Sequence, residues 1–97
     1  MDNSQLLSKN VAQSLVVPTQ NHQTFDTSGD GTFSVTLDNP RMIVNPTNSD
    51  GMISFMQVGS DVMETEYFSA GQCKPYRVKT VFGNSDGTEI SKVSIKE

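Results

Sequence analysis

The sequence predicts an all-β fold, a small antiparallel β-sandwich of jelly-roll type with an N-terminal arm. Between residues 52 and 97, short runs rich in β-branched and aromatic residues are separated by Gly, Pro, Asn and Asp, and no segment has a helical period. Turn signals recur about every ten residues, which suits roughly six to eight strands. We therefore divide the chain into an arm, residues 1–24, and a β-sandwich domain, residues 25–97.

The arm is rich in Gln, Asn and Ser, and Pro18 closes its apolar part in extended backbone. Its apolar residues are sparse, but they are too many for a terminus that makes no contacts. We therefore expect them to be buried against a partner or against the domain's own flank. A frayed terminus is the alternative. The residues concerned are Leu6, Leu7, Val11, Leu15, Val16 and Val17.

The domain opens with alternating strands. Phe33, Val35 and Leu37 alternate with Ser and Thr, which is typical of a half-buried strand. A second strand follows over residues 42–44. The turn signal at residues 48–51 predicts that a hairpin joins it to the next strand.

The strand over residues 52–58 has two apolar faces. Met52, Met56 and Val58 lie on one face, and Ile53 and Phe55 on the other. A strand with both faces apolar is expected to be central in its sheet or covered by another subunit.

The later strands alternate in the same way. Over residues 76–82 the apolar face is expected to carry Tyr76, Val78, Thr80 and Phe82. Arg77 and Lys79 face away, where they could pair with Glu64 and Glu66 of a neighbouring strand or with carboxylates of a partner. The last strand is expected to bury Val93 and Ile95.

Composition limits the function classes. The chain has 97 residues, 34% of them hydrophobic, so its small core favours association. Its net charge of −4 without a basic stripe argues against nucleic-acid binding. No run approaches the roughly 20 apolar residues of a membrane span. The start of the chain lacks the features of a signal peptide, so we expect synthesis in the cytoplasm.

The reactive residues form no persuasive constellation. Cys73, the only cysteine, is interpreted as a small packed apolar residue, although a pair with His22 is conceivable. Residues 26–31 resemble half of an EF-hand loop, but Leu37 replaces the closing ligand, so a polar turn is favoured over a weak calcium site. Glu64 and Glu66 could serve glycoside hydrolysis, yet an exposed acidic face suits a chain without Trp better. We expect no metal, no cofactor and no enzyme activity.

The order of motifs between residues 24 and 97 is distinctive. Its segments are Phe33–Leu37, Pro40–Val44, a strand from near Met52, Phe68–Gly71, Pro75–Val81, Gly83–Gly87 and Ile90–Ile95. They end in an Ala-Gly turn followed by Pro-x-Arg-Val, a Gly-rich turn and a terminal strand. In this layout residues 24–97 resemble the small virion proteins of tailed phages, namely head decoration, cement and spike-base proteins, in which such an ending is characteristic.

The resemblance implies a non-enzymatic structural virion protein, a capsid decoration or cement protein that binds and stabilises the assembled phage head. Its partner would be the major capsid protein, its assembly a homotrimer, and its location the virion surface after synthesis in the host cytoplasm. A carbohydrate- or receptor-binding module of a phage tail or fibre is the alternative. Besides the apolar residues of the arm, the expected interface comprises Met52, Met56, Val58, Arg77 and Lys79.

Overall fold

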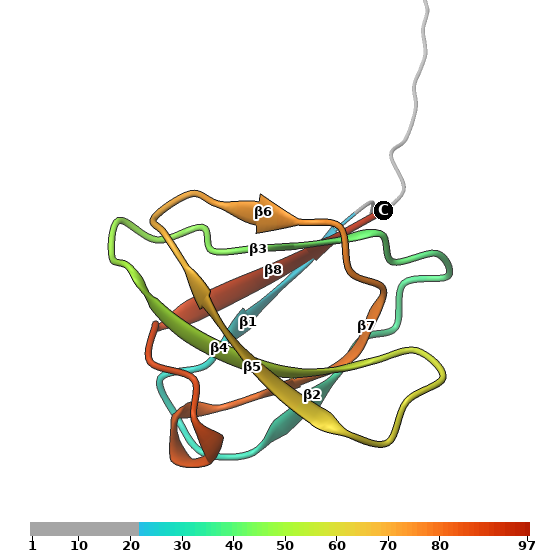
Figure 1. Ribbon diagram of the computed structural model, residues 1–97, viewed down its shortest axis with the longest axis horizontal. Coiled ribbons are helices and arrows are strands. Elements are labelled where there is room, and N and C mark those ends of the chain that lie inside the picture. Colours follow the sequence, from blue (N-terminus) through green and yellow to red (C-terminus); the bar gives the residue numbers. More distant parts are fainter. Residues whose placement is uncertain (1–21) are drawn as a thin grey trace, which may run out of the picture.

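A computed structural model describes residues 22–97 (Figure 1). Apart from one 3-10 turn, the regular secondary structure of this part of the chain is all β-strand, so the all-β prediction is confirmed. The strands are β1 (His22–Asp26), β2 (Thr32–Ser34), β3 (Met42–Val44), β4 (Gly51–Gln57), β5 (Met63–Phe68), β6 (Cys73–Lys74), β7 (Val78–Phe82) and β8 (Lys92–Lys96), and a 3-10 turn, η1 (Asn84–Asp86), precedes β8. Within residues 22–97 no helix is long and apolar enough to cross a membrane.

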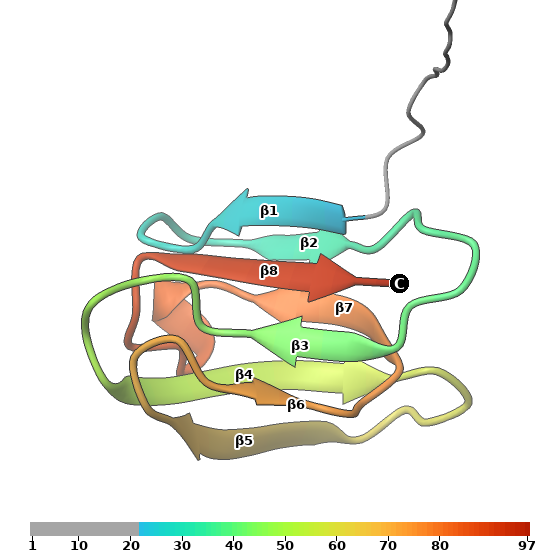
Figure 2. The ribbon, with the colours of Figure 1, turned by 90° about the horizontal axis from the view of Figure 1, so that it is seen from above.

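The strands form two antiparallel four-stranded sheets. One has the order β1-β8-β3-β6 and the other the order β2-β7-β4-β5. The sheets lie face to face, and Figure 2 shows β1 beside β2 at one edge of the sandwich and β6 beside β5 at the other. The ring centroids of Phe25 in β1 and Phe33 in β2 are 5.6 Å apart, which closes the first edge with aromatic contact.

The core lies between the sheets and consists of side chains that alternate along their strands. Ile53 and Phe55, which form one of the two apolar faces predicted for β4, point into the core, as do Val93 and Ile95 of β8, and all four have no exposed area. β4 is also central in its sheet, as predicted, with β7 on one side and β5 on the other. The core comprises Ile43, Ile53, Phe55, Phe68, Val78, Val81, Ile90, Val93 and Ile95.

The predicted hairpin between residues 42–44 and the next strand is wrong. β3 pairs with β8 and β6, whereas β4 lies in the other sheet, so the segment at residues 48–51 crosses between sheets. Buried Asn45 holds this crossing, because its Nδ2 donates to the carbonyl oxygen of Ser49 at 2.7 Å and its Oδ1 accepts from the Thr47 nitrogen at 3.0 Å. A turn signal identifies a reversal of the chain but not the strand that will pair with it.

The predicted apolar face of residues 76–82 is also wrong in part. Val78 and Val81 both point into the core, although they are three residues apart. The pairing of β4 with β7 shifts between Met56 and Gln57, so Lys79 is an extra residue in β7. Such a bulge inverts the alternation beyond it, which turns Thr80 and Phe82 outward.

The boundary of the predicted arm also differs from the structure. β1 pairs with β8 from His22 to Asp26, so residues 22–24 belong to the sandwich. Residues 1–21 lie outside the described part of the chain. That range contains the arm residues predicted to lie at an interface, namely Leu6, Leu7, Val11, Leu15, Val16 and Val17.

Candidate interaction surface

Apart from Lys79 at its margin, where β7 bulges, the outer face of the β2-β7-β4-β5 sheet carries no charged side chain at the positions that alternate with the core. Because Ile53 and Phe55 point inward, their neighbours and the residues paired with these neighbours point outward. The same reasoning applies to Val81 and its partner Phe33. We call the resulting set the charge-free face: Thr32, Ser34, Met52, Ser54, Met56, Met63, Thr65, Tyr67, Thr80 and Phe82.

The exposed apolar side chains gather at one side of this face. Four large apolar residues of the described chain are exposed, namely Val58 at 45%, Val62 at 66%, Met63 at 46% and Tyr67 at 51%. All four belong to the hairpin formed by β4 and β5, residues 51–68. Depletion of charge together with exposed aromatic and Met side chains is typical of the centre of a protein–protein interface.

Part of the face is already covered by the chain itself. Ser54 is fully buried, and its backbone nitrogen donates to Thr88 Oγ1 at 3.0 Å. Thr88 Oγ1 in turn donates to the carbonyl oxygen of Phe82 at 2.6 Å, so it bridges β4 and β7 where β7 ends. The open part of the face is therefore the side near β5.

Charged residues lie around the margin of the face. Lys79 Nζ is 3.4 Å from Asp61 Oδ1 at the tip of the β4–β5 hairpin. At the other end of the hairpin, a hydrogen bond to Asp50 raises the pKa of Tyr67, so the phenol is neutral at physiological pH. Glu89 Oε1 accepts a hydrogen bond from the Met52 nitrogen at 3.0 Å.

The outer face of the other sheet is different in character. Its alternating positions in β1 and β8 include His22, Asp26, Lys92 and Lys96, which are all exposed. This face suits solvent, so the two sides of the sandwich are chemically distinct.

The predicted interface residues that fall within residues 22–97 do not form one group. Met52 and Met56 lie half-buried on the charge-free face, and Val58 is exposed at its margin. Arg77 is exposed in the connection that precedes β7, whereas Lys79 is tied to Asp61. Met52, Met56 and Val58 therefore share a surface, while the two basic residues border it.

Three contributors to the surface were not predicted from the sequence, namely Val62, Met63 and Tyr67. The alternation of Met63, Thr65 and Tyr67 along one strand was visible in the sequence. It is a weak signal because its middle member, Thr65, is polar. Only the position of β5 beside β4 places these residues next to Met52 and Met56.

The two carboxylates considered for catalysis lie on the inner side of β5. Glu66 Oε1 is 2.9 Å from Lys74 Nζ, and the Tyr76 hydroxyl donates to both carboxylate oxygens of Glu66 at 2.9 Å. Glu64 accepts from Gln57 Nε2 at 2.8 Å. The pairing of these carboxylates with Arg77 and Lys79, which the sequence left open, does not form, because β5 has β4, not β7, as its neighbour. The favoured exposed acidic face is wrong, because both carboxylates are half-buried on the inner side of β5.

The environment of Glu66 opposes a role as general acid. The hydrogen bond from Lys74, reinforced by that from Tyr76, lowers the pKa of Glu66, so its carboxyl group is ionised at neutral pH. A general acid in glycoside hydrolysis needs a raised pKa. The hydrogen bond between Tyr76 and Glu66 also raises the pKa of Tyr76.

The segment that resembles half of a calcium loop forms a hydrogen-bonded turn. Asp26 Oδ1 accepts from the Ser28 hydroxyl at 2.5 Å and from the Ser28 nitrogen at 3.1 Å, and these bonds lower the pKa of Asp26. Thr27 is buried and donates to the carbonyl oxygen of Ile90. No group of three His, Cys, Asp or Glu side chains suited to a metal ion occurs within residues 22–97.

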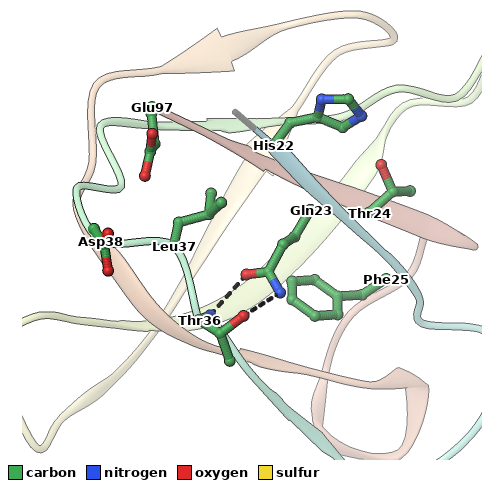
Figure 3. A pocket seen from close by; sticks show the side chains of 8 residues that line it. All are labelled: His22, Gln23, Thr24, Phe25, Thr36, Leu37, Asp38 and Glu97. Carbon is green, nitrogen blue, oxygen red and sulfur yellow. Dashed lines mark hydrogen bonds between the residues drawn. The ribbon is translucent and has the colours of Figure 1, made fainter. Parts of the chain in front are cut away.

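An open pocket of about 650 Å³ lies between β1 and the segment that follows β2 (Figure 3). Gln23 crosses it, since its Nε2 donates to Thr36 Oγ1 and its Oε1 accepts from the Thr36 nitrogen, both at 2.7 Å. His22 lines this pocket, whereas Cys73 lies in β6, at the opposite edge of the same sheet. The conceivable Cys–His pair is therefore not brought together.

No family model matches the chain, and neither a curated protein nor a solved structure matches it significantly.

Proposed function

We propose that this protein is a non-enzymatic structural protein that binds other proteins through its charge-free face. One observation carries the proposal. The four exposed large apolar side chains within residues 22–97 all belong to one hairpin and adjoin a sheet face without charge. Burying one such side chain in an interface contributes about 1.5 to 3 kcal/mol, so a partner that covers several of them gains substantial affinity.

We further propose that the two sheets form a jelly roll. The strand orders support this finer assignment. The first strand pairs with the eighth, the second with the seventh, the third with the sixth and the fourth with the fifth. A long antiparallel hairpin that is rolled up into two layers has these four pairs, and the jelly roll is the eight-stranded fold of that kind.

The partner in this proposal is the major capsid protein of a phage head. The support is the resemblance of residues 24–97 to head decoration and cement proteins of tailed phages. A shell displays many identical sites, so an oligomeric decoration protein can bind firmly through a small contact per copy. The protein then acts on the virion surface after its synthesis in the host cytoplasm.

The geometry favours this function over the two alternatives. A carbohydrate- or receptor-binding module is expected to display aromatic platforms, but Tyr67 is the one exposed aromatic side chain within residues 22–97. A hydrolase would need an acid and a base in a cleft. Glu66 is instead held by Lys74 and Tyr76 in its ionised form.

The test is binding to assembled heads of the phage that encodes the chain, measured by co-sedimentation. Met63→Lys places a charge on the charge-free face, and His22→Lys, on the outer face of the other sheet, is the matched control. We expect Met63→Lys to weaken binding by about tenfold or more, equivalent to about 1.4 kcal/mol, and His22→Lys to bind normally. Equal binding of both variants, or no binding by the parent protein, would contradict the proposal.

A further inference from the structure

The sandwich has four edge strands, and three of them are short or blocked. β2 has three residues, and β6 has two and is followed directly by Pro75. Beside β1, the Gln23 amide forms two hydrogen bonds with Thr36. These are the usual means by which natural proteins prevent an edge from pairing with another chain.

β5 is neither short nor blocked, and its protection is limited to two inward-pointing carboxylates, Glu64 and Glu66. It has six residues, contains neither Pro nor Lys, and pairs with β4 from Met63 to Phe68 without a shift in register. Within residues 22–97, the backbone groups of residues 63–67 form no hydrogen bond outside the pairing with β4. An unpaired strand of this length is a template for a further strand.

We propose that a second copy of this chain pairs with β5 in antiparallel fashion, with Thr65 opposite the partner's Thr65. This register sets Met63 opposite the partner's Tyr67 at both ends of the contact. It thereby joins the two most exposed side chains of β5, which are 46% and 51% exposed, as sulfur–aromatic pairs. The threonines meet on the two-fold axis. Registers shifted by two residues lose both sulfur–aromatic pairs.

The inner side of this contact carries carboxylates. Glu64 would lie opposite the partner's Glu66, and like charges in that position are destabilising. The charge of Glu66 is offset within its own chain by Lys74, whose Nζ lies 2.9 Å away and whose side chain is still 22% exposed. The lysine therefore lies at the edge where it can offset the charge of the partner's Glu64 as well.

This inference rests on the proposed function and specifies how the docking surface is built. Pairing through β5 would merge the charge-free faces of two copies into one continuous sheet surface. A contact that uses the same strand twice closes at two copies. It therefore predicts a dimer, in place of the trimer expected from the resemblance.

The first experiment is analytical ultracentrifugation of the full chain and three variants. Thr65→Lys sets two like charges opposite each other on the two-fold axis. Thr65→Val adds no charge and replaces the hydroxyl, which lies 2.8 Å from Ser54 Oγ, with a methyl group. Thr80→Lys places the same charge on the same face but away from β5. We expect a dimer for the parent, Thr65→Val and Thr80→Lys, and a dissociation constant about tenfold higher or more for Thr65→Lys. A monomeric or trimeric parent, or an unaffected Thr65→Lys, would overturn the inference.

The second experiment tests the register in a Cys73→Ser background. Paired residues of an antiparallel ladder have Cα atoms about 4.5 to 5.5 Å apart, within disulfide range. Thr65→Cys should therefore form a cross-linked dimer under mild oxidation. Met63→Cys should not, because the two copies of residue 63 would be about 13 Å apart along the strands. Cross-linking of both variants, or of neither, would exclude this register.

The two proposals can fail separately. A protein that dimerises through β5 but does not bind phage heads supports the inference and contradicts the proposed function. A monomer that binds heads through the charge-free face supports the proposed function and contradicts the inference of a β5 dimer.

Discussion

At the scale of single residues, Asn45 has the most connected polar side chain of the sandwich. It is fully buried. Its Nδ2 donates to the carbonyl oxygens of Ser49 at 2.7 Å and Ser69 at 3.1 Å, while its Oδ1 accepts from the nitrogen and the hydroxyl of Thr47. These bonds connect the crossing between the sheets with the turn after β5. A short amide can satisfy donors and acceptors of both segments at once.

Asn45→Ala is expected to lower the free energy of unfolding by about 2 to 4 kcal/mol. The substitution removes the four hydrogen bonds that this buried amide forms with Ser49, Ser69 and Thr47, and the net contribution of each bond is about 0.5 to 1.5 kcal/mol. Urea unfolding followed by circular dichroism measures the effect. Exposed Asn48→Ala is the control and should change stability by less than about 0.5 kcal/mol. A similar small effect for Asn45→Ala would show that water replaces the amide.

At the scale of elements, the turn between β1 and β2 packs against the connection from β7 to η1. The Gly83 nitrogen donates to the Gly31 carbonyl oxygen at 2.9 Å, and the Asn84 nitrogen donates to that of Thr27 at 3.0 Å. A side chain at position 83 would bring its Cβ within 2.5 Å of the Gly29 carbonyl oxygen. The glycine is therefore required by the close approach of two backbones and not by its own extended conformation.

Gly83→Ala should consequently destabilise the protein by about 1 to 3 kcal/mol, because one of the two segments must move to admit the methyl group. Thermal unfolding by calorimetry measures this loss. Gly29→Ala, in the same turn, is the control, since nothing lies within 4 Å of its added Cβ. Equal melting temperatures for the two variants would mean that the turn moves to admit the methyl group without a loss of stability.

At the scale of the whole molecule, the two sheets are joined at the β5–β6 edge by a polar cluster. Glu66 of β5 accepts hydrogen bonds from Lys74 of β6 and from Tyr76, and the Tyr76 ring stacks on Phe55 with centroids 5.3 Å apart. Lys74 also lies over the Phe68 ring, 4.5 Å from its centroid. The edge opposite the Phe25–Phe33 contact is thus closed by charge and hydrogen bonds.

This cluster predicts a loss of stability in acid. The pKa of Glu66 is lower in the folded protein than its ordinary value of about 4.3. Its contribution is therefore present above about pH 4.3 and is lost as the pH falls through the lowered pKa. Urea unfolding at about pH 7 and pH 3 should show a smaller pH-dependent difference in Glu66→Gln than in the parent, and an intermediate difference in Tyr76→Phe. An unchanged difference in Glu66→Gln would assign the acid sensitivity to other carboxylates.

The sequence by itself determined the fold class and much of the core. Alternation is a local property of a strand, so the shared face of Ile53 and Phe55, that of Val93 and Ile95, and the central place of β4 could be read from side-chain order. Which of the two apolar faces of β4 lies in the core could not. The sequence also placed Met52 and Met56 on one face of their strand, and they lie together on the outer side of the sheet.

Only the tertiary structure decided which strands pair. Pairing joins residues far apart in the chain, and neither turn signals nor composition encode it, so the crossing after β3 and the contact of Glu66 with Lys74 were not predicted. The bulge at Lys79 was equally hidden, because one extra residue inverts every later position. Which side of the β4–β5 hairpin is exposed likewise depends on which parts of it the other strands cover. That coverage is a property of the packed sandwich as a whole.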